Sequence, residues 1–249
     1  SIKKIMNPRE FGAIKPKFIP YPSIIPAFTA IDFESKNSRY KDMSNKNDKI
    51  SKWYWASIFT NNYSSSVESQ ATSDFSVMQK WFGDNNAVPE IINQAKNDIK
   101  VMDLKKETSQ SSAIYNAIFN LMAIDGARDP VTFELPEYSS LDDHHIIPQN
   151  SKLGKKLGNK VNTILNRIAI SDETNRSVFK VRLPNEYIKE ILKNAKDKNK
   201  VYEMLESHFI TKRIVDEILL RDPFEVKDFE EFIAEREKLI KEKVENLFK

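Results

Sequence analysis

The stretch LDDHHIIPQNSKLGKKLGNKVNTILNRIAISDETNRSVFKVRLP, residues 141–184, decides the organisation of this chain. It holds two of the chain's three histidines side by side, His144 and His145, followed directly by Ile-Ile-Pro148. Burying adjacent imidazoles without polar partners is unfavourable, so something must offset that cost. The residue types predict that a metal ion together with a phosphate group does so.

The spacing of two asparagines completes the pattern. Asn166 opens the apolar run 166–170, which is typical of a strand, and Asn175 follows the acidic helix start at 171–173. Neighbouring strand residues point to opposite faces, and a twist at the strand end lets His144 face a metal while His145 faces a water molecule. Histidine accepts a proton near neutral pH, and a carboxamide oxygen suits Mg²⁺. A second asparagine can hold the base imidazole in one tautomer.

The order of these residues resembles the HNH, or ββα-metal, nuclease motif. His144-His145-Ile-Ile-Pro148 matches its first strand, Asn166 its second strand, and Asn175 its helix. The resemblance implies that His144 and Asn175 bind Mg²⁺ or Mn²⁺, that His145 is the general base, and that Asn166 orients it. Many members carry Asp where this chain has His144, so Asp143, one place earlier, is the alternative metal ligand.

A wider resemblance covers most of the chain. The segments KWYWASIFTNNYS (52–64), LPNEYI (183–188) and DFEEFIAEREKLIKEKV (228–244) surround the motif. In this order they are similar to the C-terminal part of GmrSD-type modification-dependent restriction proteins, in which an NTPase domain precedes a helical region with an embedded HNH motif. The NTPase features, such as a DGQQR-like motif, are missing here. The resemblance implies the effector half of an anti-phage restriction system, acting on DNA with an NTPase domain or subunit as partner. The first residue is Ser1 and not Met, so we expect an excised fragment or a tag remnant.

Composition narrows the class of protein. The 249 residues are 40% hydrophobic and 30% charged, which is typical of a globular chain. Only five glycines occur, without a Gly-rich phosphate loop, which favours helices and disfavours nucleotide binding by that route. The absence of cysteine excludes disulfides and thiolate zinc sites and is compatible with the cytoplasm, where we expect the protein. No apolar run approaches the length of a membrane span, so we expect no membrane partner.

Basic residues are concentrated around the histidines. Residues 144–213 hold 15 lysines and arginines against 7 acids, a balance of +8, whereas the whole chain carries +3. Such an excess suits a polyanion, although a solvated lysine-rich surface is the alternative. We expect a loop over 149–161 to grip a phosphate backbone. The predicted nucleic-acid-binding residues are Lys152, Lys155, Lys156, Lys160, Arg167, Arg176 and Lys180.

The remaining chain predicts a mainly α fold, a helical body with an embedded ββα-metal core. We expect an N-terminal helical region over 1–138, the core over 139–184, and C-terminal helices over 185–249 that pack back on the N-terminal region. Apolar periodicity predicts helices over 23–32, 46–61, 66–82, from 89, and over 111–124, 185–195, 200–209, 212–220 and 226–247. An extended piece is expected over 131–138. Trp53 and Trp55 lie on a helical stripe, which favours the core over stacking on bases, and His208 is expected to be a packing or capping residue.

The expected chemistry is metal-assisted phosphodiester hydrolysis. His145 takes a proton from water, the hydroxide attacks in line, and the products carry 3′-hydroxyl and 5′-phosphate ends. One active site cuts one strand, so a double-strand break needs a homodimer or two successive cleavage events. Two other functions remain open on the sequence: a DNA-binding module with an inactive motif, and an interaction module for a partner NTPase.

Overall fold

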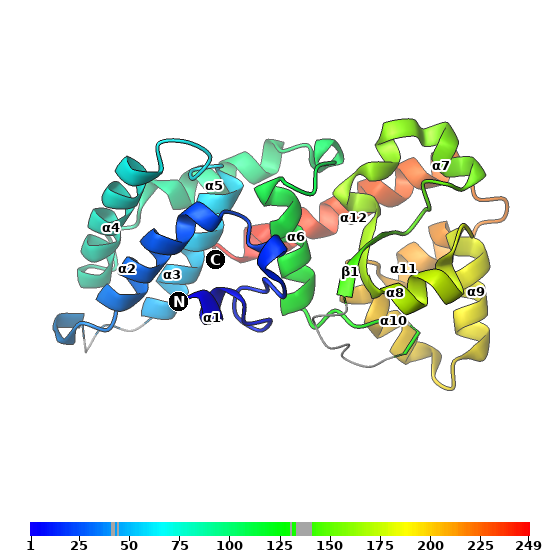
Figure 1. Ribbon diagram of the computed structural model, residues 1–249, viewed down its shortest axis with the longest axis horizontal. Coiled ribbons are helices and arrows are strands. Elements are labelled where there is room, and N and C mark those ends of the chain that lie inside the picture. The colour runs from blue at the N-terminus through cyan, green and yellow to red at the C-terminus, as the bar shows by residue number, and fades with distance from the viewer. Residues whose placement is uncertain (41–42, 44, 130, 133–140) are drawn as a thin grey trace.

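The computed structural model describes residues 1–249 except 41–42, 44, 130 and 133–140, and within these residues the chain is mainly helical (Figure 1). The predicted mainly α class is therefore confirmed. The longer helices are α2 (Ile25–Glu34), α3 (Lys46–Phe59), α4 (Val67–Gly83), α5 (Glu90–Val101), α6 (Ala113–Ile124), α7 (Lys152–Leu157), α9 (Pro184–Asn194), α10 (Lys198–Glu206) and α12 (Val226–Asn246).

Shorter helical turns connect these helices. They are α1 (Ile2–Ile5), η1 (Pro16–Phe18), η2 (Pro22–Ile24), η3 (Ser38–Tyr40), η4 (Leu104–Lys106), η6 (Gly158–Asn162), η7 (Ile164–Asn166), α8 (Asp172–Thr174), η8 (Asn175–Phe179), α11 (Lys212–Ile214) and η9 (Val215–Leu219). Each predicted helix is present. The expected loop over 149–161 is wrong in one respect, because it contains α7 and η6. The extended piece predicted at 131–138 lies largely outside the described residues.

The N-terminal helices enclose an aromatic core. Helix α3 packs against α5, α6, α2 and α4. Trp53 and Trp55 are buried in this core, and the Nε1 of Trp53 donates to the buried carboxylate of Asp74 at 2.9 Å. The prediction that the two tryptophans belong to the core is confirmed, and burial makes their rings inaccessible to bases.

Helix α12 connects the two ends of the molecule. It runs from beside α7 to the N-terminal helices, where it packs against α5 (Figure 1). Its fully buried Arg236 donates through Nη1 to the carbonyl of Leu165 at 2.8 Å and through Nε to that of His208 at 3.1 Å. His208 is itself buried, with Nε2 2.9 Å from the carbonyl of Arg128, so its predicted packing role is confirmed. The division at 138 and 184 stays a prediction.

A two-stranded antiparallel sheet carries the motif. Strand β1 (Leu141–His145) pairs with β2 (Arg167–Ser171), so that His144 lies opposite Ile168 and His145 opposite Arg167. The residues 168–170 of β2 are buried, and β2 packs against α6. Because side chains alternate along a strand, Asp143 and His145 leave one face of β1 while His144 leaves the other.

Candidate active site

Four of the five predicted catalytic and metal-binding residues line one cavity of about 200 Å³. Its walls come from the end of β1, from the turn that follows it, and from the segment that begins with η8. The complete lining consists of Asp143, His144, His145, Pro148, Gln149, Asn150, Asn175, Lys180 and Val181. The fold thus brings both histidines and Asn175 to one place, although 30 residues separate His145 from Asn175 in the sequence.

The imidazole of His145 is held by Asn162. Its Nε2 lies 3.0 Å from Asn162 Oδ1, and the Nη2 of Arg167 lies 3.4 Å from the same oxygen. A guanidinium only donates hydrogen bonds, so the oxygen of the Asn162 amide faces both groups. His145 therefore donates through Nε2–H, and its Nδ1 carries the lone pair that can accept a proton.

The surroundings of His145 favour the neutral imidazole. Burial lowers its pKa, and the positive charge of Arg167 lowers it further, against smaller opposing effects of the Asn162 hydrogen bond and Asp143. The net pKa lies below the ordinary value, so the side chain is a proton acceptor at neutral pH. Asn162 was not singled out in the sequence, where it is one polar residue in a lysine-rich segment.

The expected contact of Asn166 with the base is wrong. Asn166 is fully buried, and its Oδ1 accepts a hydrogen bond from the Ile147 N–H at 2.9 Å. Its Nδ2 donates to the carbonyls of Ile147 at 3.0 Å and Val161 at 2.8 Å. The side chain therefore joins the two ends of the 147–161 segment, and it positions His145 only through the backbone two residues away.

A carboxylate that the sequence did not single out lies beside His144. The His144 Nε2 is 3.3 Å from Asp172 Oδ1, and Asp172 is the first residue of α8. Its other oxygen accepts from the exposed Arg176 at 3.3 Å. The sequence predicted that the acids at 172–173 begin a helix, and Asp172 does begin α8. Its contact with His144 was not predicted.

Asp143 is not favoured as the alternative metal ligand. Its Oδ2 accepts hydrogen bonds from Gln110 Nε2 at 2.7 Å and from the Tyr115 hydroxyl at 2.6 Å, and Arg167 Nη1 lies 3.5 Å away. Only 7% of its side chain is exposed. This carboxylate is hydrogen-bonded to Tyr115 of α6 and to Gln110, which precedes α6. It also leaves β1 on the same face as His145 and on the face opposite His144. Asp143 therefore lies on the side of the site that holds the base.

A buried carboxylate holds the helix that carries Asn175. Asp129 Oδ2 accepts from the backbone N–H of Ser171 at 3.0 Å and from its hydroxyl at 2.8 Å, and Oδ1 accepts from the Thr174 hydroxyl at 2.8 Å. Burial alone would raise the pKa of Asp129, but the hydrogen bonds outweigh it and the pKa is lowered. Asp129 thus fixes the start of α8 relative to β2. Asp129 is not among the predicted site residues.

The predicted nucleic-acid-binding residues separate into distinct groups. Lys180 lines the cavity, and Arg176, which is exposed and follows Asn175 in the chain, forms an ion pair with Asp172. Lys152 and Lys156 line a neighbouring pocket, Lys155 is exposed on α7, and Lys160 pairs with Glu230 at 3.6 Å. The assignment of Arg167 to nucleic acid is wrong, because this residue is 8% exposed and its guanidinium contacts Asp143 and Asn162.

The side chains that the resemblance assigns to a metal ion are few and of mixed type. Among the described residues no group of three or more histidine, cysteine, aspartate or glutamate side chains is close enough to hold a metal. The two predicted metal ligands that line the cavity apart from Asp143, His144 and Asn175, supply one imidazole and one carboxamide, and the Asp172 carboxylate lies beside the imidazole. The carboxamide and carboxylate oxygens suit Mg²⁺, which retains several waters and binds through few protein groups, whereas an imidazole is the more usual ligand of transition metals.

Comparison with known proteins leaves the function open. No family model matches the chain, and no solved structure matches it. Over 217 residues it is 37% identical to a protein of Methanocaldococcus jannaschii that is described only as uncharacterized. The match covers 79% of this chain and 37% of that protein's length. No helix in the described ranges has the length and apolar content needed to span a bilayer.

Proposed function

We propose that this chain is a metal-dependent HNH endonuclease that nicks or cleaves DNA. The observation that carries the proposal is that His144, His145 and Asn175 line one cavity, with the Nδ1 of His145 left as the proton acceptor. The lowered pKa of His145 supports the same role, because a general base must be neutral at the working pH. The resemblance of the surrounding segments to GmrSD-type restriction proteins supports the substrate class.

Each residue of the site has its own role in the proposed hydrolysis. His145 takes the proton of a water molecule through Nδ1, while Asn162 keeps Nε2 protonated and the ring oriented. The hydroxide attacks the phosphodiester in line and leaves 3′-hydroxyl and 5′-phosphate ends. His144 and Asn175, with Asp172 adjacent, would hold Mg²⁺ or Mn²⁺, and a bound cation of this kind offsets the charge on the leaving oxygen. Lys180 lies at the same cavity and neutralises the phosphate.

Plasmid nicking tests this function. With Mg²⁺ or Mn²⁺ present, the wild-type protein should convert supercoiled plasmid to the open circle, and His145→Ala should slow this by about 10²–10⁴-fold. Asn194→Ala, at the exposed end of α9, is the control and should nick at the wild-type rate. Wild-type nicking by His145→Ala would refute the assignment. Salt-sensitive DNA binding without any metal-dependent nicking would instead favour the DNA-binding module with an inactive motif.

The proposed partners follow from the same resemblance. The match covers 37% of the length of the uncharacterized relative. On the resemblance to GmrSD-type proteins, an NTPase domain or subunit is proposed as the element that controls cleavage. A homodimer would supply the two sites needed for a double-strand break. Nicking assays on modified and unmodified DNA, with the NTPase partner added or omitted, test this control. The cytoplasmic location stays a prediction.

A further inference from the structure

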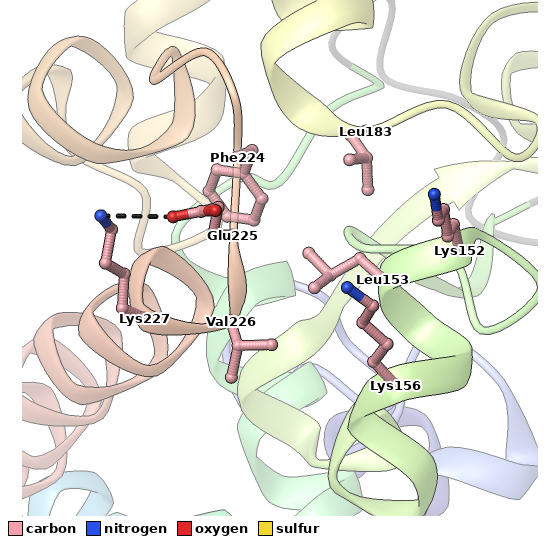
Figure 2. Close-up of a pocket in the computed structure, with 8 residues that line it drawn as sticks. All are labelled: Lys152, Leu153, Lys156, Leu183, Phe224, Glu225, Val226 and Lys227. Carbon is pink, nitrogen blue, oxygen red and sulfur yellow. Dashed lines mark ion pairs between the residues drawn. The ribbon is translucent and has the colours of Figure 1, made fainter.

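A second pocket lies next to the candidate active site and has about twice its volume, about 430 Å³ against about 200 Å³. Figure 2 shows α7 on one side of it and the segment 224–227 that leads into α12 on the other. Leu153 and Phe224 contribute apolar surface, and Leu183 closes a third side. The pocket therefore combines an apolar floor with a charged rim.

The charge of this rim is positive and not compensated. Lys152 and Lys156 both come from α7, four residues apart, so they lie on one face of the helix and repel each other. In the part of the chain that the structure describes, neither amine forms an ion pair. Glu225 and Lys227, across the pocket, pair with each other at 3.3 Å (Figure 2). An anion between these walls would relieve the repulsion of the two α7 lysines.

Helix α7 is fixed rigidly to the wall of the active cavity. The Ser151 hydroxyl donates to the Pro148 carbonyl at 2.6 Å and accepts from the Gly154 N–H at 2.9 Å. A Cβ on Gly154 would lie 2.2 Å from the Pro148 oxygen, so only glycine allows this close packing. Pro148 lines the active cavity, and Lys152 begins the other pocket. These contacts fix the start of α7 against the turn that lines the active cavity.

The same two chain segments line both pockets. The first runs from Pro148 through Asn150 to Lys152 and Lys156, and the second runs from Lys180 to Leu183. Asn150 and Lys152 are two residues apart, which places their Cα atoms within about 7.6 Å of each other. A polyanion with regularly spaced charges can therefore occupy both sites at once, whereas a single small anion cannot.

We propose that this second pocket is a flanking subsite for the nucleic-acid strand, in which Lys152 and Lys156 bind backbone phosphates one or two nucleotides from the bond to be cut. The subsite rests on the proposed nuclease function and makes it more specific. It also divides the basic residues of α7, because Lys155, on the same helix, does not line the pocket and takes no part.

Binding measured without divalent metal tests the subsite separately from catalysis. The probes are fluorescein-labelled DNAs of about 16 nucleotides, one single-stranded and one duplex, titrated in EDTA at several salt concentrations. The variant is Lys152→Ala with Lys156→Ala. The control is Lys155→Ala with Lys193→Ala, which removes the same charge from exposed positions outside the pocket. Thermal melting checks that both proteins remain folded.

Loss of two phosphate contacts should reduce the slope of log K against log salt by about 1.4 for the single strand or about 1.8 for the duplex, and weaken binding on the order of tenfold at low salt. The control should change both quantities much less. Equal effects of the two double variants would overturn the subsite, as would a polyglutamate peptide that competes as well as the oligonucleotide. The nuclease proposal has separate criteria, since it fails on the nicking assay, either because the wild-type protein does not nick or because His145→Ala nicks at the wild-type rate.

Discussion

Replacing Asn162 with aspartate tests how the base is positioned. The substitution keeps the shape of the side chain but places a carboxylate oxygen where Oδ1 now lies, 3.0 Å from His145 Nε2. A negative charge stabilises the imidazolium, so the pKa of His145 should rise from its lowered value. The size of this rise in pKa can be worked out from the contacts of residue 162.

The magnitude follows from two opposing contacts. Opposite charges about 4 Å apart at an effective dielectric of about 20 attract by about 4 kcal/mol, which corresponds to roughly three pKa units as an upper limit. Arg167, 3.4 Å from the same oxygen, takes a share of the new carboxylate's charge. We therefore expect a rise of about one to two units. At pH 6 the variant would hold a protonated base and nick on the order of tenfold more slowly, with rates converging at high pH.

Two assays measure this shift independently. The chain has only three histidines, so NMR titration of the imidazole signals reports the pKa of His145 without reference to activity. The pH–rate profile of nicking should show its acidic limb displaced upward by the same amount. Asn162→Ala is the control, because it removes the hydrogen bond without adding charge and should not raise the pKa. A His145 titration midpoint that is unchanged in folded Asn162→Asp would refute the reasoning.

Three further predictions concern the surrounding structure. Asn166→Ala leaves two carbonyls and one N–H of the buried backbone without their partner, so the free energy of unfolding measured in urea should fall by about 3 kcal/mol or more. A loss below about 1 kcal/mol would contradict the role of Asn166 in joining the two ends of the 147–161 segment. Burial lowers the pKa of His208 to about 4, so the contribution of this side chain to stability is present above about pH 6.5 and is lost as the pH falls through about 4. In the wild type, the free energy of unfolding should fall by up to about 3 kcal/mol over this range. His208→Gln should make the free energy of unfolding nearly independent of pH there. Asp172→Asn should weaken Mn²⁺ binding on the order of tenfold in a titration followed by electron paramagnetic resonance, whereas Asp222→Asn, another exposed aspartate in an ion pair, should leave it unchanged.

The local order of elements could be read from the chain alone. Apolar periodicity located the long helices, and the apolar residues 168–170 located β2. The strand with the two histidines, β1, was implied by the resemblance to the HNH motif. The tryptophans of α3 were assigned to the core on their spacing, and they are buried. These features depend on residues a few positions apart, whose interactions the sequence displays directly.

The partners of the site residues were decided by tertiary structure. Asn162 and not Asn166 contacts His145, because the turn of η6 returns the chain beneath the strand end. Asp129 reaches Ser171 across 42 residues, and the approach of α6 brings Tyr115 to Asp143. Residue type and spacing indicated which side chains can carry chemistry. Which side chains meet depends on how buried helices and strands pack, and contacts between positions so far apart leave no periodic pattern in a single sequence.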